Sequence, residues 1–244
     1  SLVIFSAHGV SREVEERTKS RNLNYFDATC PLVTKVHMEV RKHANANKDI
    51  ILVGHEGHPE VEGTMGRHEN SENSSIYLVE NENDAKNITI TKKNNLAVVT
   101  QTTLSVDETK SIIDILKDRF PNISIPKKDD ICYATQNRQD AVKQLALESD
   151  FMIVVGSKNS SNSNRLRELS EKCGCKSVLI DEFNDLDLNE LMNFSNISIT
   201  AGASAPESRV MEIAKSLESH IGAEIVQHGE DNENIYFKLP PGLR

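Results

Sequence analysis

The sequence has no apolar run long enough to span a bilayer and no basic segment followed by an apolar leader. We therefore predict a soluble protein with no membrane partner. Basic residues are not in excess either, because 28 Lys and Arg stand against 37 Asp and Glu, giving a formal net charge of −9. This balance argues against a general nucleic-acid binder, which needs a basic face for phosphate contacts. It does not exclude a small anionic ligand, since clustered backbone N–H groups bind anions locally.

Cysteine is scarce: the 244 residues include four, Cys30, Cys132, Cys173 and Cys175. So few cysteines in a chain of this length do not form a disulfide scaffold, and they favour a reducing compartment. The CxxC spacing of a zinc ribbon is absent. We interpret Cys173 and Cys175, on either side of Gly174, as small buried side chains.

One pattern recurs along the chain: a short apolar run, then a polar loop, then a helical periodicity. The runs are Leu2–Phe5, Ile50–Val53, Leu96–Val99, Phe151–Val155 and Ile197–Thr200. This alternation predicts an α/β fold in which crossover helices connect the strands of parallel sheets. Ligands of such sheets bind outside the carboxyl ends of the strands, so the loops after these runs are the candidate site.

The loops after the last three runs are rich in Ser, Thr and Asn and lead into predicted helices. Ser105 and Ser204 each precede a Glu by three residues, which is the spacing of a capping box. Helix N-termini with hydroxyl and amide donors also suit a phosphate. Capping alone explains most single residues of this kind. It does not explain the cluster Ser160-Ser161-Asn162, for which we predict anion binding ahead of a helix expected over Arg165–Lys172.

Two of the cysteines lie just before predicted helices. Cys30 precedes a helical pattern over Leu32–Ala44, and Cys132 precedes one over Gln136–Glu148. A helix N-terminus stabilises a thiolate, which is the form that acts as a nucleophile or a soft-metal ligand. The alternative for a lone cysteine is a small buried side chain.

Histidines follow two of the predicted strands. His8 comes after the first run, and His55 and His58 come after the second. The order His-Glu-Gly-His is not the HExxH of metalloproteases, and Pro59 would interrupt a helix carrying both ligands. We interpret His58 as an anion ligand and Glu60 as a proton donor. The remaining histidines have no motif context and are predicted to be solvated: His37, His43, His68, His220 and His228.

Seven ordered motifs between residues 7 and 206 resemble those of the 4-hydroxy-3-methylbut-2-enyl diphosphate reductases, the LytB/IspH family. They read AHGVS, DATCPLVTKVH, GHPEVEGT, TQTTLS, DDICYAT, GSKNSSNSNRL and TAGASAP. The resemblance implies three small parallel-sheet subdomains in a pseudo-threefold trefoil around a central iron–sulfur site. The first subdomain would be residues 1–30 with the returning segment 217–244, the second 31–128 and the third 129–216.

The resemblance also implies roles for individual residues. Cys30 and Cys132 would be two of three thiolates on a [4Fe–4S] cluster, Glu60 would protonate the substrate hydroxyl and Thr102 would relay protons to it. The implied diphosphate ligands are His8, His58, Ser160, Ser161, Asn162 and Ser204. The implied reaction reduces (E)-4-hydroxy-3-methylbut-2-enyl diphosphate to isopentenyl and dimethylallyl diphosphate, the last step of the non-mevalonate isoprenoid pathway. A ferredoxin or flavodoxin would supply electrons in the bacterial cytoplasm, or in a plastid.

The sequence departs from the family at its start. The family's N-terminal Gly-Phe-Cys segment, with a cluster cysteine and a following His, is not in this chain, which opens at Ser1. We therefore expect an N-terminal truncation and a fragment that is inactive alone. Two other functions fit part of the pattern. A redox-free sugar-phosphate isomerase would use the polar loops with His58 and Glu60, and a phosphometabolite-binding module would need only the loops.

Overall fold

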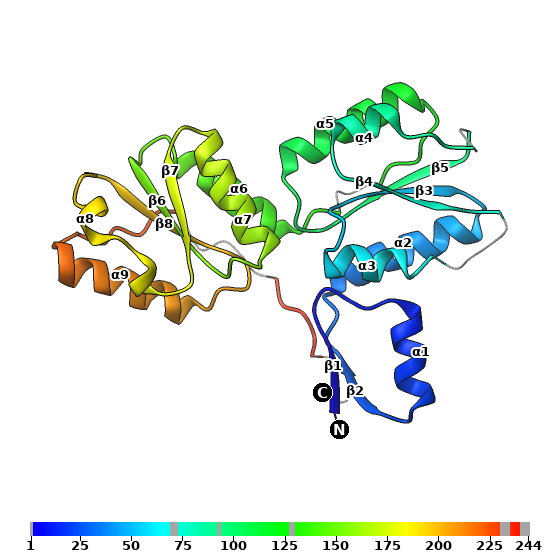
Figure 1. Ribbon diagram of the computed structural model, residues 1–244, viewed down its shortest axis with the longest axis horizontal. Helices are drawn as coiled ribbons and strands as arrows, with labels where there is room; N and C mark the ends of the chain where they lie inside the picture. Colours follow the sequence, from blue (N-terminus) through cyan, green and yellow to red (C-terminus); the bar gives the residue numbers. More distant parts are fainter. Residues whose placement is uncertain (1, 69–72, 92–93, 127–129, 230–234, 240–244) are drawn as a thin grey trace. The chain divides into compact units, whose positions relative to one another are not determined.

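The computed structural model describes residues 2–68, 73–91, 94–126, 130–229 and 235–239 (Figure 1). The chain divides into two compact units. One is Ser1–Cys132 together with Asn234–Arg244, and the other is Tyr133–Glu233. Within the described ranges, no helix is both long and apolar enough to cross a bilayer.

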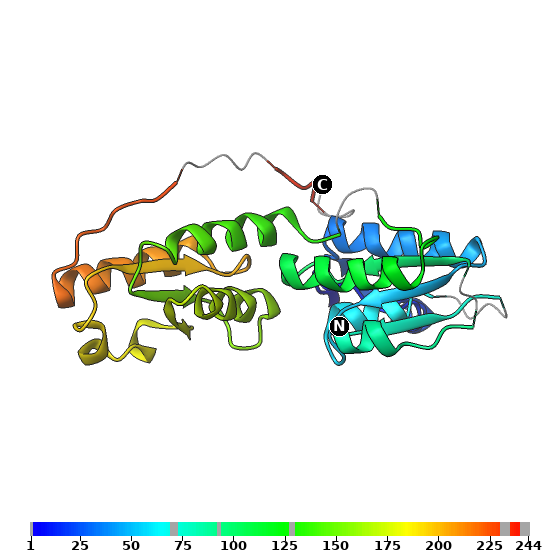
Figure 2. The same cartoon turned by 90° about the horizontal axis from the view of Figure 1, so that it is seen from above.

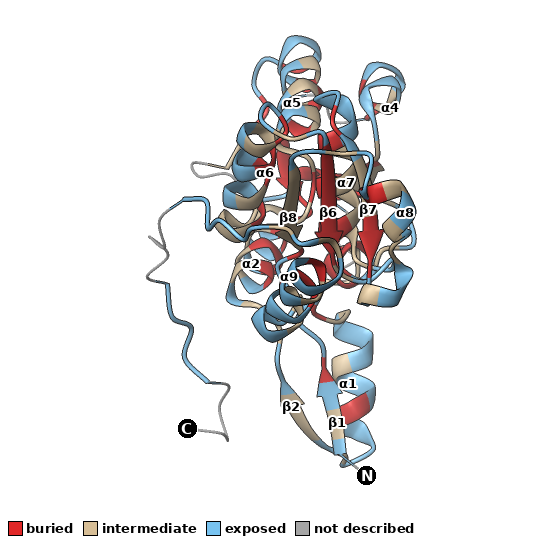
Figure 3. Cartoon of the chain, turned by 90° about the vertical axis from the view of Figure 1, so that its left-hand side faces the viewer, coloured by how far each residue is buried: buried red, intermediate tan, exposed pale blue. Residues whose placement is uncertain are grey.

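The first unit begins with a small two-stranded sheet. Strands β1 (Leu2–Phe5) and β2 (Asn24–Asp27) are parallel, and helix α1 (Arg12–Ser20) connects them. The Ser11 hydroxyl accepts a hydrogen bond from the first turn of α1, at Val14 N, and so starts the helix. Both strands are largely exposed or half-buried (Figure 3), so this sheet contributes little core of its own.

The second sheet of this unit has the order β4-β3-β5, with all pairs parallel. Its strands are β3 (Asp49–Val53), β4 (Ile76–Val79) and β5 (Leu96–Thr100). Its helices are α2 (Pro31–Asn45), α3 (Pro59–Met65), α4 (Glu82–Asn87) and α5 (Val106–Arg119), with α2 and α3 below the sheet and α4 and α5 above it in Figure 1.

The side chains of β3 point alternately to the two faces of the sheet, and helices cover both faces. Ile50 and Leu52 belong to the core cluster that includes Val36 and Val40 of α2. Ile51 packs in the cluster on the other face with residues of α5. Every residue of β3 and β5 is buried, as expected for the continuous apolar runs of a covered parallel sheet.

The second unit repeats this architecture with the order β7-β6-β8. Its strands are β6 (Phe151–Val155), β7 (Lys176–Ile180) and β8 (Ile197–Ala201). Its helices are α6 (Tyr133–Leu145), α7 (Ser161–Lys172), the short 3₁₀ turn η1 (Phe183–Asp185), α8 (Leu188–Leu191) and α9 (Glu207–Ile221). Met152 packs in the cluster with residues of α6 and α7, and Ile153 packs in the cluster with residues of α9, orange in Figure 2.

The predicted α/β fold with three small parallel sheets is confirmed. The proposed limits of three subdomains stay a prediction, and the limit between residues 128 and 129 lies outside the described residues. Helix α9 continues across the limit at 216/217, because Leu217 and Ile221 pack on the same core cluster. Residue Ser1 also lies outside the described residues.

Three local predictions were wrong. Helix α6 begins at Tyr133, a turn earlier than predicted, so Cys132 directly precedes it. Helix α7 begins at Ser161 instead of Arg165. The predicted cap Ser204 does not cap α9, because Pro206 is the N-cap residue and the helix starts after it.

Candidate functional site

The predicted site residues of the first unit follow the carboxyl ends of its strands. His8 follows β1, Cys30 follows β2, His58 follows β3 and Thr102 follows β5. The strands β1 and β2 belong to one sheet and β3 and β5 to another, and in each parallel sheet these ends lie at one edge, which is where ligands of such folds bind. Glu60 lies in the first turn of α3, the helix that begins directly after His58.

Glu60 and Thr102 are in direct contact. The Thr102 backbone N–H donates to Glu60 Oε1 at 2.7 Å, and the Thr102 hydroxyl donates to Glu60 Oε2 at 2.9 Å. The Glu60 side chain is buried, with 1% of the residue exposed. Burial raises the pKa of Glu60 to about 7, with a smaller contribution from the Asp130 charge, while the two bonds from Thr102 oppose the rise. The carboxyl group can therefore hold or release a proton near neutral pH.

His58 caps the helix that carries Glu60. Its Nδ1 accepts a hydrogen bond from Glu60 N at 3.1 Å, so the neutral ring carries its proton on Nε2. Burial lowers the pKa of His58 to about 4, and the neighbouring His8 adds to the effect. The His8 and His58 rings meet edge to face with centroids 5.5 Å apart. The two histidines therefore form one group beside Glu60.

The two cysteines of interest are free and half-buried. Cys30 is the N-cap residue of α2, but its side chain does not cap the helix; its backbone N–H donates to Ala7 O at 3.0 Å. The Cys132 backbone N–H donates to Thr102 O at 2.9 Å, and α6 begins at the next residue. Both cysteines thus lie at helix starts, as predicted, and the structure adds that each is held by a backbone hydrogen bond. Among the described residues, no three His, Cys, Asp or Glu side chains are grouped as a metal site.

Sequence reasoning missed an ion pair beside Cys132, in which a buried carboxylate meets a partly exposed lysine. The Asp130 carboxylate lies 3.0 Å from Lys35 Nζ, and its other oxygen accepts from Thr100 N at 3.1 Å. Asp130 belongs to the DDICYAT motif, and its place in that motif was the sequence feature that could have identified it. Gln101 was missed as well: it is 1% exposed and accepts from His55 N at 3.1 Å, which holds the histidine loop.

Two further predictions were wrong. His37 was expected to be solvated, but it is buried on the inner face of α2, and burial lowers its pKa to about 4. Cys173 was expected to be buried, but it is exposed, because it is the C-cap residue of α7; Cys175 is buried as predicted.

In the second unit, the polar loop after β6 ends in the first turn of α7. The Ser160 hydroxyl accepts from Ser163 N at 3.3 Å and caps the helix, so Ser161 and Asn162 fall inside it. Asn162 Oδ1 accepts from Ala203 N at 2.8 Å. Since β6 and β8 are adjacent and parallel, this bond joins the loops that follow both strands.

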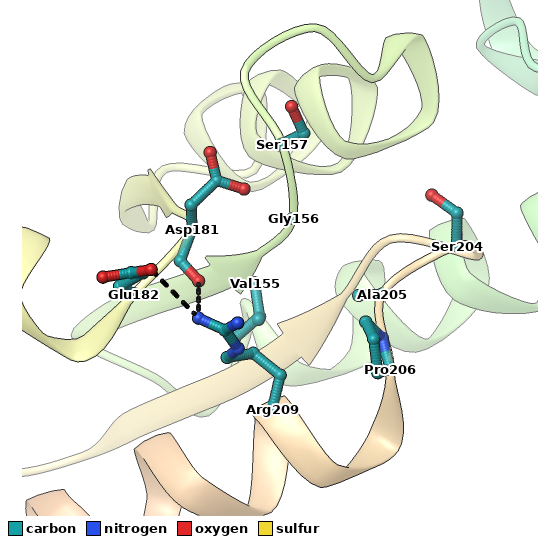
Figure 4. Close-up of a pocket in the computed structure, with 9 residues that line it drawn as sticks. All are labelled: Val155, Gly156, Ser157, Asp181, Glu182, Ser204, Ala205, Pro206 and Arg209. Atoms are coloured by element: carbon teal, nitrogen blue, oxygen red, sulfur yellow. Dashed lines mark hydrogen bonds and ion pairs between the residues drawn. The ribbon is translucent and has the colours of Figure 1, made fainter.

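Ser204 lines a cavity of about 430 Å³ at the same sheet edge of this unit (Figure 4). Gly156 and Ser157 form one side of this cavity, and Arg209 of α9 points toward Asp181 and Glu182 on another. The Arg209 guanidinium lies 3.5 Å from the Glu182 carboxylate.

Parallel sheets with a buried carboxyl group and paired histidines near their strand ends define an α/β protein with a candidate acid–base site. The family described as LytB protein matches residues 1–218. The chain is 56% identical over 243 residues to a 4-hydroxy-3-methylbut-2-enyl diphosphate reductase of Saccharophagus degradans, covering 100% of this chain and 78% of the relative. The chain belongs to the LytB family.

Solved structures agree with this assignment. The E-1-hydroxy-2-methyl-but-2-enyl-4-diphosphate reductase from Plasmodium falciparum is 37% identical with a TM-score of 0.92, covering 99% of this chain and 76% of that one. A structure described as (E)-4-hydroxy-3-methyl-but-2-enyl diphosphate reductase, the terminal enzyme of the non-mevalonate pathway, is 30% identical with a TM-score of 0.58, covering 89% and 76%.

Proposed function

We propose that this chain belongs to an enzyme that reductively removes the hydroxyl group of (E)-4-hydroxy-3-methylbut-2-enyl diphosphate, giving isopentenyl and dimethylallyl diphosphate. Membership of the LytB family supports the reaction class. The observation that carries the proposal is the buried Glu60 carboxyl group, held by Thr102 and with a pKa of about 7. A sugar-phosphate isomerase or a simple binding module receives no support from the relatives.

The cofactor would be a [4Fe–4S] cluster, with Cys30 and Cys132 as two of the three thiolates that the family resemblance implies. These residues fit the group, because both thiols are free, half-buried and placed at helix starts, where thiolates are favoured. When bound, the cluster supplies single electrons and a Lewis-acidic iron.

Glu60 would supply the proton for the departing hydroxyl group, because hydroxide is a poor leaving group. A carboxyl group with a pKa of about 7 still carries its proton in part of the molecules at neutral pH. A protonated Glu60 can donate from Oε2 to the Thr102 hydroxyl, whose own hydrogen then turns toward the substrate. The 2.9 Å contact between these oxygens suits such a relay.

The diphosphate would be bound by neutral donors. His58 presents Nε2–H, because its Nδ1 accepts from the α3 backbone, and His8 lies beside it. In the second unit, the Ser160 hydroxyl accepts a backbone hydrogen bond, which leaves its own hydrogen available for a phosphate oxygen. Ser161 is the first residue of α7, where free backbone N–H groups favour an anion.

Asn162 and Ser204 complete the proposed diphosphate ligands. Asn162 joins the two loops of the second unit through Ala203, so it would also hold the ligand-binding loops in place. Ser204 faces the cavity at the end of β8. The electron donor would be a ferredoxin or a flavodoxin, and the compartment the bacterial cytoplasm.

Activity measurements on the full-length protein that contains this chain test the proposal. The protein is reconstituted with iron and sulfide without oxygen, and the two products are measured with and without a chemical reductant. Glu60→Gln should lower the rate by a factor of about 10² to 10⁴, the usual range for a lost general acid. Glu62→Gln, exposed on the same helix, is the matched control. Product formation without reductant, or an unchanged rate in Glu60→Gln, would refute the proposal.

A further inference from the structure

Asp130 is a buried carboxylate that makes contacts to two other elements. Its side chain is 0% exposed, whereas that of its partner Lys35 is 38% exposed. Asp130 Oδ1 lies 3.0 Å from Lys35 Nζ, and Oδ2 accepts from Thr100 N at 3.1 Å. The two bonds to opposite oxygens hold the carboxylate in one orientation.

These contacts join the elements that carry the two cysteines. Lys35 lies in α2, whose N-cap residue is Cys30. Thr100 is the last residue of β5. Two residues further along each segment, Cys132 N donates to Thr102 O at 2.9 Å. The stretch from Asp130 to Cys132 therefore runs beside the end of β5. The Thr100 N–H is bound by the Asp130 carboxylate instead of by a main-chain carbonyl group.

A buried carboxylate is a costly way to hold a loop, because removing a charge from water is compensated only by well-formed partners. Main-chain pairing or an apolar side chain would dock a loop with less desolvation. The carboxylate also links this loop to α2 through the ion pair with Lys35, across 95 positions of sequence. Such a link restrains the distance between groups that the loop and the helix carry.

We propose that Asp130 is a positioning residue which, with Lys35, fixes the spacing between the Cys30 and Cys132 thiols. This inference rests on the proposed function, in which both thiols bind one iron–sulfur cluster. The Asp130 carboxylate contacts Lys35 and Thr100 N, so it would act through the main chain that ends at Cys132. Its loss should weaken the hold on the cluster.

Three substitutions separate this role from general stability. Asp130→Asn keeps the shape, but its amide cannot face both Thr100 N and the Lys35 ammonium with an acceptor. Lys35→Met removes the cation, and Lys35→Arg restores it. The matched control is Asp49→Asn, since Asp49 is also buried in this unit and also accepts a backbone hydrogen bond, from Ser75 N at 2.9 Å, but at the start of β3.

The test uses the full-length protein reconstituted with iron and sulfide, and follows iron content, the EPR spectrum of the reduced cluster and the rate at which the visible absorption fades in air. Far-UV circular dichroism of the cluster-free proteins checks folding. Asp130→Asn and Lys35→Met should lose the cluster at least about tenfold faster and change the EPR spectrum, as changes outside the ligand set commonly do. Lys35→Arg and Asp49→Asn should behave as the unaltered protein does.

Two results would overturn the inference alone. One is an Asp130→Asn protein that holds the cluster as long as the unaltered protein, with the same EPR spectrum. The other is an Asp49→Asn protein that loses it equally fast, which would indicate general destabilisation. An unaltered protein that takes up no cluster overturns the proposed function and this inference with it.

Discussion

The buried Glu60 carboxyl group should contribute to the pH dependence of the stability of the first unit, and Glu60→Gln should remove that contribution. The glutamine side chain has nearly the same shape. Its oxygen can accept from Thr102 N, and its amide can donate to the Thr102 hydroxyl, which reverses the bond seen at Oε2. The substitution thus keeps the packing and removes only the ionisation.

The sign follows from the direction of the pKa shift. Burial raises the pKa of Glu60 from 4.5 to about 7, so between these values the folded state binds a proton that the unfolded state has released. The contribution of Glu60 to the free energy of unfolding is then highest below pH 4.5, falls as pH rises toward 7, and stays level above it. At about 1.4 kcal/mol per pH unit, the loss from this group is about 3 kcal/mol. Glu60→Gln should lack this loss, so its advantage over the unaltered protein should grow by about 3 kcal/mol across the range.

Urea unfolding of the cluster-free protein, followed by far-UV circular dichroism from pH 4 to pH 8, measures the effect; the chain contains no Trp for fluorescence. The difference in unfolding free energy between Glu60→Gln and the unaltered protein is the quantity to plot. Glu62→Gln, exposed on the same helix, is again the matched control. A flat difference for Glu60→Gln would mean that Glu60 ionises at its ordinary pKa, and the reasoning about a buried acid would fail.

Two other predictions concern the cysteines and a close contact in the second unit. Cys30→Ser and Cys132→Ser should each abolish the visible absorption of the reconstituted protein. Cys173→Ser, at an exposed position, is the control and should keep that absorption. A coloured Cys30→Ser or Cys132→Ser protein would contradict the ligand assignment. Gly202→Ala should destabilise the second unit by about 1 to 3 kcal/mol in urea unfolding, because its Cβ would lie 2.1 Å from the buried Ser163 hydroxyl. Adding Ser163→Ala should recover most of that loss, and strictly additive effects in the double-mutant cycle would refute the steric explanation.

Local sequence patterns determined most of the secondary structure. The runs Leu2–Phe5 and Phe151–Val155 are strands with the predicted bounds, and β3, β5 and β8 differ by one residue. Such runs are readable because burial on both faces of a parallel sheet requires a continuous apolar stretch. Strand β4 (Ile76–Val79) was not predicted; three of its four residues are half-buried, so its pattern is weaker.

Motif order along the sequence indicated the family, and with it the chemistry expected of Cys30, Glu60 and Thr102. Only the tertiary structure decided which of these residues meet. The contact between Glu60 and Thr102 depends on β3 pairing with β5, and the Lys35–Asp130 pair joins residues 95 positions apart. Sequence periodicity reports which face of an element is buried, but not which element lies against it. The burial that raises the pKa of Glu60 is set by packing from distant segments, and for that reason only the folded chain reveals it.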